Sequence, residues 1–404
     1  MMASFSGIGC TSGPSLDGLD MCYVEFTGDV QTDIWGYRII KATTVPYTPE
    51  WQGQLKGAAQ MSGEELVKLH VEYGHFLGQT IDEFIQTEEI NNLDFIASNG
   101  HSIFHQPDFG YTFNLGDGET TSVHLKYPFV CNFRSKDVAL GGQGAPLVTN
   151  GEKFLFSYKD ICLNLSGIAN IGLRGLQGYD VCPCNYVSNK LATLHDPKLE
   201  YDPCGVIAKS GEILPQVLEG LESLNYYKQP PPKSIGSEWM DGKVLPLLDT
   251  VKYQIPDLLR TYTEHVANKL AETCRRGKDS LEVENLTKQS SKTTILVSGG
   301  GTFNTFLIDL FKSKLSNDGF AIEIADSDTI IFKEALIFAF LGLRSLLNQE
   351  NITASVTGGR CDSVSGSIHR PVHSTSSVSR IIRYLMEKNK QRIRTESSSS
   401  LSSM

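Results

Sequence analysis

Three apolar segments of this chain each run directly into a turn rich in glycine and serine, at residues 9–18, 166–170 and 298–304. A single turn of this kind is typical of ordinary loops. Glycine, however, lets backbone N–H groups approach an anion without a blocking Cβ. Three such turns in one chain therefore predict duplicated β-hairpin domains whose turns face a common cleft. None of them carries the lysine of a Walker loop or the spaced glycines of a dinucleotide fingerprint.

The bulk composition narrows the class of protein. A chain of 404 residues is long enough for two domains, and 40% apolar with 20% charged residues is typical of a globular protein. A net charge of −10 argues against a nucleic-acid partner. The first residues lack the basic and apolar regions typical of a signal peptide, and the longest apolar run, at 335–343, is too short to span a membrane. We therefore expect a cytoplasmic protein with no membrane partner.

The nine cysteines are an odd number scattered along the chain, which is typical of reduced thiols in a reducing compartment. Cys182 and Cys184 are close together, but this pair without a second pair or nearby histidines is weak evidence for zinc. We expect both to be small buried residues.

The periodicity of apolar residues predicts two α/β units. An antiparallel meander is expected over 5–45, an amphipathic helix over 63–88 and a strand over 93–101, and the pattern restarts with strand, turn and strand at 161–173. Helices are expected at 213–224, 256–275 and 330–347, a rigid loop at 228–239 and a surface excursion at 276–292. The predicted domains are 1–130, joined by a segment near 350–367, and 131–350, with a largely disordered extension at 368–404.

Several segments resemble one known family. They are the three turns together with FRSKDVALGGQGAPLV (133–148), GYDVCPCN (178–185), YDPCG (201–205), PPPKSIGSEW (230–239) and KEALIFAFLG (333–342). In this order they resemble anhydro-N-acetylmuramic acid kinase, over residues 6–367. The resemblance implies an α/β fold with two ribonuclease-H-like, actin-like ATPase domains around a central cleft for ATP and substrate. It also implies a homodimer and a place in peptidoglycan recycling.

The resemblance assigns residues to each ligand. ATP would be held by Gly13, Pro14, Ser15, Leu16, Asp17, Gly18, Leu19, Asp20, Ser166, Gly167, Gly299, Gly300 and Gly301. The sugar would meet Arg134, Gln143, Gly144, Asn185, His101 and Glu334, with Lys233 a weaker candidate. Two of these residues have equally good structural explanations, because Asp17 suits an Asx turn and Glu334 suits the N-terminal end of a helix.

The family's reaction opens the 1,6-anhydro bridge of a sugar and phosphorylates O6 with ATP. Its catalytic base is the aspartate of a Phe/Tyr-Asp motif, which falls on Asp180. A carboxylate suits this step, because it can deprotonate the water that attacks C1. Asp17 would lie near the phosphates and hold Mg²⁺ directly or through water.

The chain departs from the family's usual pattern at several positions. Pro14, Asn99, Asn132 and Ser166 stand where threonine, histidine, aspartate and glycine are usual. Each hydrogen bond lost to a charged phosphate could cost about 1.5–3 kcal/mol. Two alternatives therefore stay open beside the expected kinase: a kinase for another anhydro-sugar such as levoglucosan, and a catalytically impaired member that binds or regulates.

Overall fold

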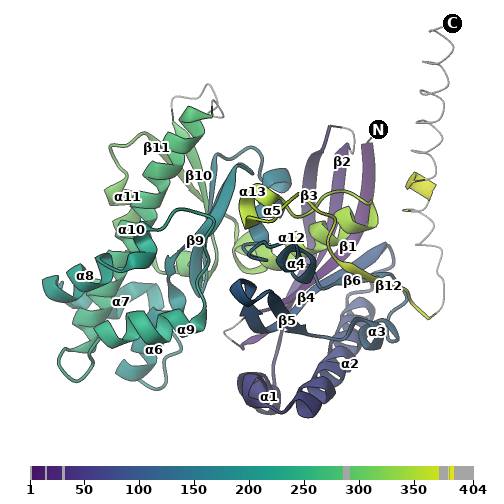
Figure 1. Ribbon diagram of the computed structural model, residues 1–404, viewed down its shortest axis with the longest axis horizontal. Coiled ribbons are helices and arrows are strands. Elements are labelled where there is room, and N and C mark those ends of the chain that lie inside the picture. The colour runs from purple at the N-terminus through teal and green to yellow at the C-terminus, as the bar shows by residue number, and fades with distance from the viewer. Residues whose placement is uncertain are drawn as a thin grey trace, which may run out of the picture.

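The protein contains two β-sheets that lie side by side as two lobes (Figure 1). The computed structural model describes residues 2–13, 16–29, 32–284, 292–372, 381 and 383–385. The first sheet consists of β1 (Met2–Ser12), β2 (Gly18–Asp29), β3 (Ile34–Pro46), β4 (Phe95–Gln106), β5 (Tyr111–Leu115), β6 (Phe129–Cys131) and β12 (Ser367–His369). The second consists of β7 (Ile161–Leu165), β8 (Ile168–Leu173), β9 (Gln177–Pro183), β10 (Thr293–Ser298) and β11 (Phe320–Ile324).

The two sheets share one connectivity. In the first, the antiparallel meander β1–β2–β3 is extended beyond β1 by the parallel strands β4 and β6. In the second, the antiparallel meander β7–β8–β9 is extended beyond β7 by the parallel strands β10 and β11. This repeated arrangement confirms the predicted α/β fold with two ribonuclease-H-like units. The residue boundaries predicted for the two domains stay a prediction.

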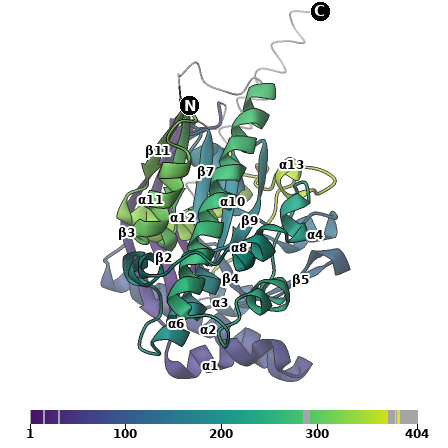
Figure 2. The ribbon, with the colours of Figure 1, turned by 90° about the vertical axis from the view of Figure 1, so that its left-hand side faces the viewer.

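Helices cover the outer faces of both sheets, and α10 runs across the second sheet with α8 and α11 beside it (Figure 2). In the first half of the chain the helices are α1 (Pro49–Gly57), α2 (Gly63–Thr87), α3 (Gly118–Ser122), α4 (Ser135–Ala139) and α5 (Val148–Leu155). The others are α6 (Asn185–His195), α7 (Val206–Ser210), α8 (Pro215–Glu222), α9 (Ser237–Trp239), α10 (Ile255–Val283), α11 (Thr305–Lys314), α12 (Ser327–Leu346) and α13 (Ala354–Thr357). No helix in these ranges is long and apolar enough to cross a membrane.

The predicted elements agree with the structure in most places. Helix α2 begins after Ser62, whose side chain forms a capping box with Glu65, and it ends one residue before the predicted end. The predicted excursion at 276–292 is wrong in its first part, because α10 continues to Val283 with Gly277 and Leu281 on its buried side. Residues 285–291 and most of the predicted extension lie outside the described residues. Strand β12 was not anticipated.

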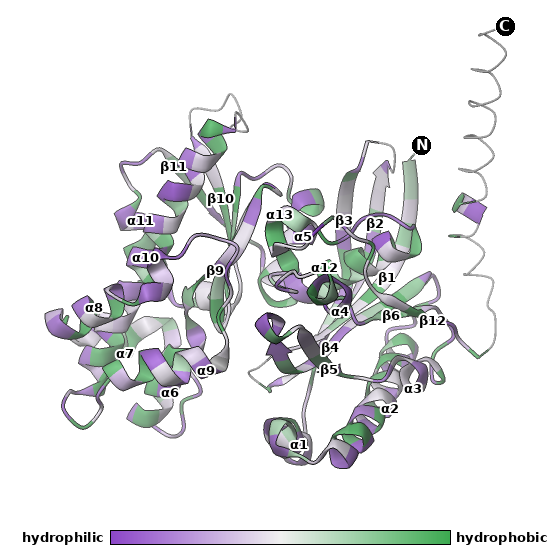
Figure 3. Cartoon of the chain, viewed as in Figure 1, coloured by the Kyte–Doolittle hydropathy of each residue, from purple (hydrophilic) through white to green (hydrophobic). Residues whose placement is uncertain are grey.

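Helix α12 follows the second sheet in the chain but packs on the first. It contacts β1, β2 and β4, and its apolar residues join Phe95 and Val130 of the first sheet and Cys162 and Leu296 of the second in one core. Figure 3 shows these inner strands and α12 as hydrophobic, whereas α8, α10 and α11 carry polar residues outward. The helix approaches β1 so closely that a Cβ on Gly9 would lie 1.8 Å from the Ala335 carbonyl oxygen. Helix α12 is therefore the packing layer between the two sheets.

Two adjacent charged residues, Lys333 and Glu334, interrupt the apolar sequence of α12. Lys333 is almost fully buried, its ammonium group pairs with the buried carboxylate of Glu152 on α5, and it donates to Ser298 Oγ at 2.9 Å. Ser298 ends β10, directly before the third glycine turn. A buried cation is stable only when it is paired and hydrogen-bonded, so this contact joins α12 to both α5 and β10.

Replacing Lys333 by methionine leaves the Glu152 carboxylate buried without its cation. We expect Lys333→Met to lower the free energy of unfolding by about 3–5 kcal/mol. Lys190 pairs with Asp241 at the surface, so the matched variant Lys190→Met should change it by about 1 kcal/mol or less. Urea denaturation followed by circular dichroism measures both. Equal effects of the two substitutions would contradict a structural role for the buried pair.

Candidate active site

The first turn, between β1 and β2, is held by the strand and helix beside it. The N–H of Tyr47 donates to the Asp17 carbonyl oxygen at 3.2 Å, and Gln52 Nε2 donates to the Leu16 carbonyl oxygen at 3.1 Å. Leu16 adopts a positive φ of 58°. Gly13 precedes the part of the turn that lies outside the described residues, namely Pro14 and Ser15.

The residues at the end of this turn and at the start of β2 have different surroundings. Gly18 begins β2 and donates to Asp17 Oδ1 at 3.0 Å, so the Asp17 side chain accepts from the backbone of its own turn. The donor is the next residue and not the second residue on, as it would be in an Asx turn. Asp20 accepts a hydrogen bond from Thr44 Oγ1 at 2.6 Å. The Leu19 side chain is fully buried in the core of the first sheet, so only its backbone is available to a ligand.

The second and third turns meet at Asn185, the first residue of α6. Its Nδ2 donates to the Leu165 carbonyl oxygen at 3.2 Å and would lie 3.9 Å from a Cβ on Gly300. The Ser166 and Gly167 carbonyl oxygens accept from backbone N–H groups at the start of the same helix. The structure thus places Asn185 with the glycine turns of the second sheet. Its expected contact with the sugar stays a prediction.

Asp180 lies on β9 and is 8% exposed. Its Oδ2 accepts from the Ile235 N–H at 2.9 Å, and its backbone N–H donates to the Lys233 carbonyl oxygen at 3.2 Å. The Tyr226 hydroxyl donates to the Asp180 carbonyl oxygen at 2.5 Å. Burial raises the pKa of Asp180 to about 6, although the Ile235 N–H and Arg134 act in the opposite direction. A carboxylate with this pKa is ionised at neutral pH and is basic enough to accept a proton.

Arg134 connects the two halves of the site. Its Nη1 donates to the Gly144 carbonyl oxygen at 2.6 Å, whereas its buried Nε has no hydrogen-bond partner. Burial lowers the pKa of Arg134, and the nearby carboxylates of Glu334 and Asp180 oppose this shift. Arg134 is therefore close to a carboxylate of α12 and to the carboxylate of β9, and its buried Nε is available to a ligand.

The loop at 141–146 is anchored by residues that the sequence did not single out. The fully buried Asp137 accepts from the Gly144 N–H and from Thr357 Oγ1, both at 2.7 Å. Gln143 accepts from Ser234 Oγ at 3.2 Å. Because Ser234 adjoins Ile235, the loop is linked to the segment that holds Asp180. The aspartate of FRSKD, which is Asp137, is the only feature of the sequence that could have indicated this anchor.

Glu334 links this cluster to the first turn. Burial raises the pKa of Glu334, opposed by Arg134 and Lys333. Burial also raises the pKa of Asp20 to about 6, with the carboxylates of Asp17 and Glu334 adding to the shift. The acidic groups of the first turn and of α12 are therefore close enough to repel one another, and a cation between them would relieve that repulsion.

His101, named from the sequence, and His105 both belong to β4. His101 Nδ1 lies 2.9 Å from Ser12 Oγ, in a buried network with Tyr47 and Tyr73. Burial lowers its pKa to about 4, so the imidazole is neutral. This network joins the end of β1 to β4 and α2, and the expected contact of His101 with substrate stays a prediction. His105, by contrast, adjoins Arg134, which contributes to lowering the pKa of this histidine to about 4 after burial.

The comparisons with known proteins cover nearly the whole chain. A sequence model of the anhydro-N-acetylmuramic acid kinase family matches residues 6–371. The chain belongs to this family. A relative of that name from Aliivibrio fischeri is 30% identical over 371 residues, covering 87% of this chain and 95% of the relative. Another, from Sulfurovum, is 29% identical over 377 residues, covering 90% and 98%.

The similarity of this chain to a solved structure is much weaker than its similarity to these relatives. Component A of the (R)-2-hydroxyglutaryl-CoA dehydratase of Acidaminococcus fermentans aligns with a TM-score of 0.37 at 10% identity, covering 83% of this chain and 96% of that one. A similarity this weak gives no information about the site. The resemblance to the anhydro-N-acetylmuramic acid kinase family drawn from the motifs is thus confirmed by the sequence comparisons.

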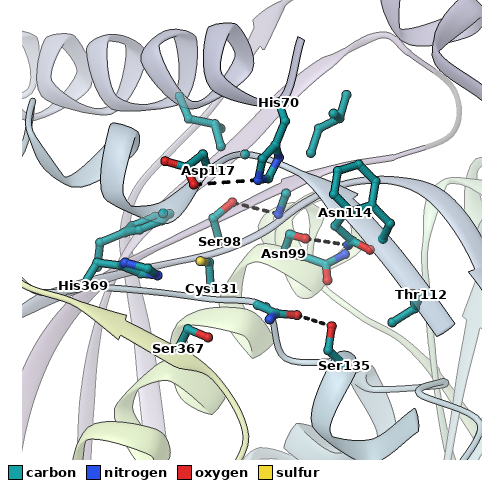
Figure 4. Close-up of a pocket in the computed structure, with 18 residues that line it drawn as sticks. His70, Ser98, Asn99, Thr112, Asn114, Asp117, Cys131, Ser135, Ser367 and His369 are labelled. Atoms are coloured by element: carbon teal, nitrogen blue, oxygen red, sulfur yellow. Dashed lines mark hydrogen bonds and ion pairs between the residues drawn. The ribbon is translucent and has the colours of Figure 1, made fainter. Parts of the chain in front are cut away.

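Two positions at which this chain departs from the usual pattern of anhydro-N-acetylmuramic acid kinases line one cavity. Asn99 and Asn132 border a cavity of about 230 Å³, together with His70, Asp117 and His369 (Figure 4). All of its lining residues come from the first lobe and β12. Asn99 Oδ1 is buried without a hydrogen-bond partner. The two departures are therefore neighbours around one space.

The third turn offers a matched pair of substitutions. Gly299 has a φ of 85°, and a Cβ there would lie 2.7 Å from Asn164 Oδ1 and from the Leu165 carbonyl oxygen. We expect Gly299→Ala to lower the free energy of unfolding by at least about 1–3 kcal/mol, since both the backbone and the contact are strained. Gly300→Ala should change it by no more than about 0.5 kcal/mol. Thermal unfolding by calorimetry distinguishes the two, and similar losses would contradict the described turn.

Proposed function

We propose that this protein is an ATP-dependent kinase that hydrolytically opens 1,6-anhydro-N-acetylmuramic acid and phosphorylates its O6. The family and the names of its relatives support this proposal. The observation that carries it is the placement of Asp180, a buried carboxylate held by the Ile235 N–H and close enough to Arg134 for that cation to lower its pKa. The product is N-acetylmuramic acid 6-phosphate.

The reaction assigns one task to Asp180. Its carboxylate takes a proton from a water molecule, the water oxygen bonds to C1, and the C1–O6 bond of the bridge breaks. The freed O6 then attacks the γ-phosphorus of ATP, ADP leaves, and the proton held by Asp180 passes to solvent. Positioned acid–base catalysis of this kind contributes about 10²–10⁴-fold to the rate.

Arg134 and the loop at 141–146 are proposed to bind and orient the sugar. The buried, unpartnered Nε of Arg134 provides a donor for a sugar oxygen or a carboxylate. Gln143 and Gly144 are fixed by Ser234 and Asp137, so the loop is rigid before substrate binds. Glu334, whose carboxylate is also close to Arg134, is proposed to complete the contact with substrate.

The three glycine turns are proposed to hold ATP. Residues 13–20, of which Pro14 and Ser15 lie outside the described part, would hold its phosphates from the first sheet, and Ser166, Gly167 and residues 299–301 would do so from the second. Magnesium is usually held by one or two carboxylates together with phosphate oxygens and water. The acidic pair Asp17 and Asp20 fits that donor set, because burial, with its acidic neighbours adding to the effect, destabilises the Asp20 anion and raises its pKa. When bound, the ion would neutralise charge on the transferring phosphoryl group.

A kinase for another anhydro-sugar such as levoglucosan is not favoured, because the matching family and its relatives carry the name of the muramic sugar. An impaired, purely binding member is not favoured either, since Asp180, Arg134 and Asn185 are all present. A homodimer stays a prediction.

The direct test is ADP release, coupled to a spectrophotometric assay, with 1,6-anhydro-N-acetylmuramic acid, levoglucosan and no sugar as the three arms. We expect turnover with the muramic sugar. Asp180→Asn should reduce kcat by about 10²–10⁴-fold, because the variant cannot accept the proton, while ATP still protects the protein in a thermal shift assay. Full activity of this variant would show that another residue is the base. No turnover together with no ATP-dependent shift would refute the kinase itself.

The raised pKa of Asp180 predicts the pH profile. A base with a pKa of about 6 is protonated, and therefore inactive, below that pH. We expect kcat/KM to fall on the acidic side with an apparent pKa near 6 and to be level above pH 7. Asp20 also has a pKa of about 6, so Asp20→Asn is the comparison variant. Its kcat/KM should fall at every pH because a proposed Mg²⁺ ligand is lost, but the acidic limb should persist in the activity that remains. A profile that is flat down to pH 5, or a limb that disappears in this variant, would contradict the assignment.

A further inference from the structure

A second cavity lies behind the strand that carries Asp180. It measures about 320 Å³ and is bordered by β9, by α10 and by the segment at 227–233. Tyr179 and Val181 line this cavity. Asp180, beside an irregularity in the pairing of β9 with β8, does not line it, and its carboxylate accepts from the Ile235 N–H. The cavity is therefore separate from the proposed catalytic site but shares one strand with it.

Cationic groups dominate this cavity. Lys228, Lys233, Lys269 and Arg276 line it, against the single carboxylate of Glu272. Lys269 forms ion pairs with Glu272 at 2.8 Å and with Glu222 at 2.5 Å, and Glu222 does not line the cavity. Arg276 also forms an ion pair with Glu272. Even with both carboxylates counted, the cations are in excess, in a chain whose net charge is −10.

Lys233 is the half-buried cation of this cavity that has no ion pair within the described part of the chain. Its Nζ donates to the Tyr226 carbonyl oxygen at 3.0 Å and lies 4.5 Å from the centre of the Tyr226 ring, and it forms no ion pair with any carboxylate among the described residues. Burial and the neighbouring Arg276 lower its pKa to about 8. A half-buried ammonium group beside other cations is an unfavourable arrangement that a bound anion would relieve.

The walls of the cavity suit a small organic anion. The rings of Tyr179 and Tyr227 provide apolar faces, and Gln177, Gln229 and Thr273 provide neutral polar groups. Ligand sites commonly occupy roughly 300–1,000 Å³, so this cavity matches the lower end of that range. Charge, aromatic faces and neutral polar groups together are the features that recognise a sugar bearing an oxyanion.

We propose that this cavity is a regulatory binding site for a small sugar phosphate, with the phosphate on Lys233 and Arg276 and the sugar against the tyrosine rings. Lys233 is thereby reassigned, because its side chain lines this cavity, which Asp180 does not line. The product of the proposed reaction belongs to the same chemical class. Only the regulatory part rests on the proposed function.

The route from this cavity to Asp180 is short. The Lys233 carbonyl oxygen accepts from the Asp180 N–H, and Ile235, two residues further, donates to its carboxylate. Tyr226, whose carbonyl oxygen is held by Lys233 Nζ, donates its hydroxyl to the Asp180 carbonyl oxygen. An anion that draws Lys233 Nζ away from Tyr226 would act on both ends of this clamp and thus change the position of the carboxylate.

Isothermal titration calorimetry with the full chain tests the site, using glucose 6-phosphate, glucose and inorganic phosphate as probes. We expect glucose 6-phosphate to bind more tightly than either of the others. Lys233→Met should weaken it by about tenfold or more, because a charged hydrogen-bond partner is lost, and Arg276→Gln should weaken it as well. Lys56→Met, at the end of α1, should have no effect. Thermal unfolding confirms that each variant is folded.

Arg134→Met separates this cavity from the proposed catalytic site. Binding that survives in Arg134→Met and is lost in Lys233→Met supports the proposal. Binding lost in Arg134→Met, or no binding of glucose 6-phosphate to the wild-type protein, overturns it. Equal affinity for inorganic phosphate overturns the assigned ligand class.

Turnover measured with and without glucose 6-phosphate tests regulation separately. We expect kcat to change at least twofold in the wild-type protein and not in Lys233→Met. An unchanged kcat despite binding overturns the regulatory part alone. A wild-type protein without kinase activity refutes the proposed function and leaves the result of the binding experiment intact.

Discussion

The relative placement of the two sheets depends on the buried ammonium group of Lys333. It joins α12, which packs on the first sheet, to Glu152 of α5 and to Ser298 at the end of β10 in the second. A charge in this position must be paired on all sides, so the three elements have little freedom to move independently. The next residue of the helix, Glu334, is fixed in turn beside Arg134.

Around this helix, the site is a series of charges drawn from both sheets. Asp17 lies in the turn of the first hairpin and Asp20 in its second strand. Glu334 belongs to α12, Arg134 directly precedes α4, and Asp180 belongs to the second sheet. Burial raises the pKa of three of these carboxylates, so each holds its proton more tightly than it would in water. A site of this kind suits a reaction that moves a proton and then transfers a phosphoryl group, because both steps need closely placed opposite charges.

The sequence predicted the parts of this arrangement that depend on local patterns. The two meanders, α2 and the glycine turns follow from alternation, helical spacing and turn residues, and the Phe/Tyr-Asp motif indicated Asp180. The sequence could not predict contacts between distant residues, such as Thr357 with Asp137, His101 with Ser12, or β12 with β6. The only feature of the sequence that pointed to the pair of Lys333 and Glu152 was the presence of two charged residues inside an apolar helix. The sequence did not show that Glu152 is the partner of Lys333. The length of α10 was underestimated because polar residues masked its buried side.

The account's central claim is that water opens the sugar at C1 and that ATP phosphorylates the O6 released from the bridge. One turnover in H₂¹⁸O, quenched quickly and analysed by mass spectrometry with fragmentation, tests this claim most directly. The account predicts one ¹⁸O in the sugar phosphate, confined to the oxygen on C1, and none in the phosphoryl group. A product without ¹⁸O, or ¹⁸O in released inorganic phosphate with the sugar bridge intact, would contradict it.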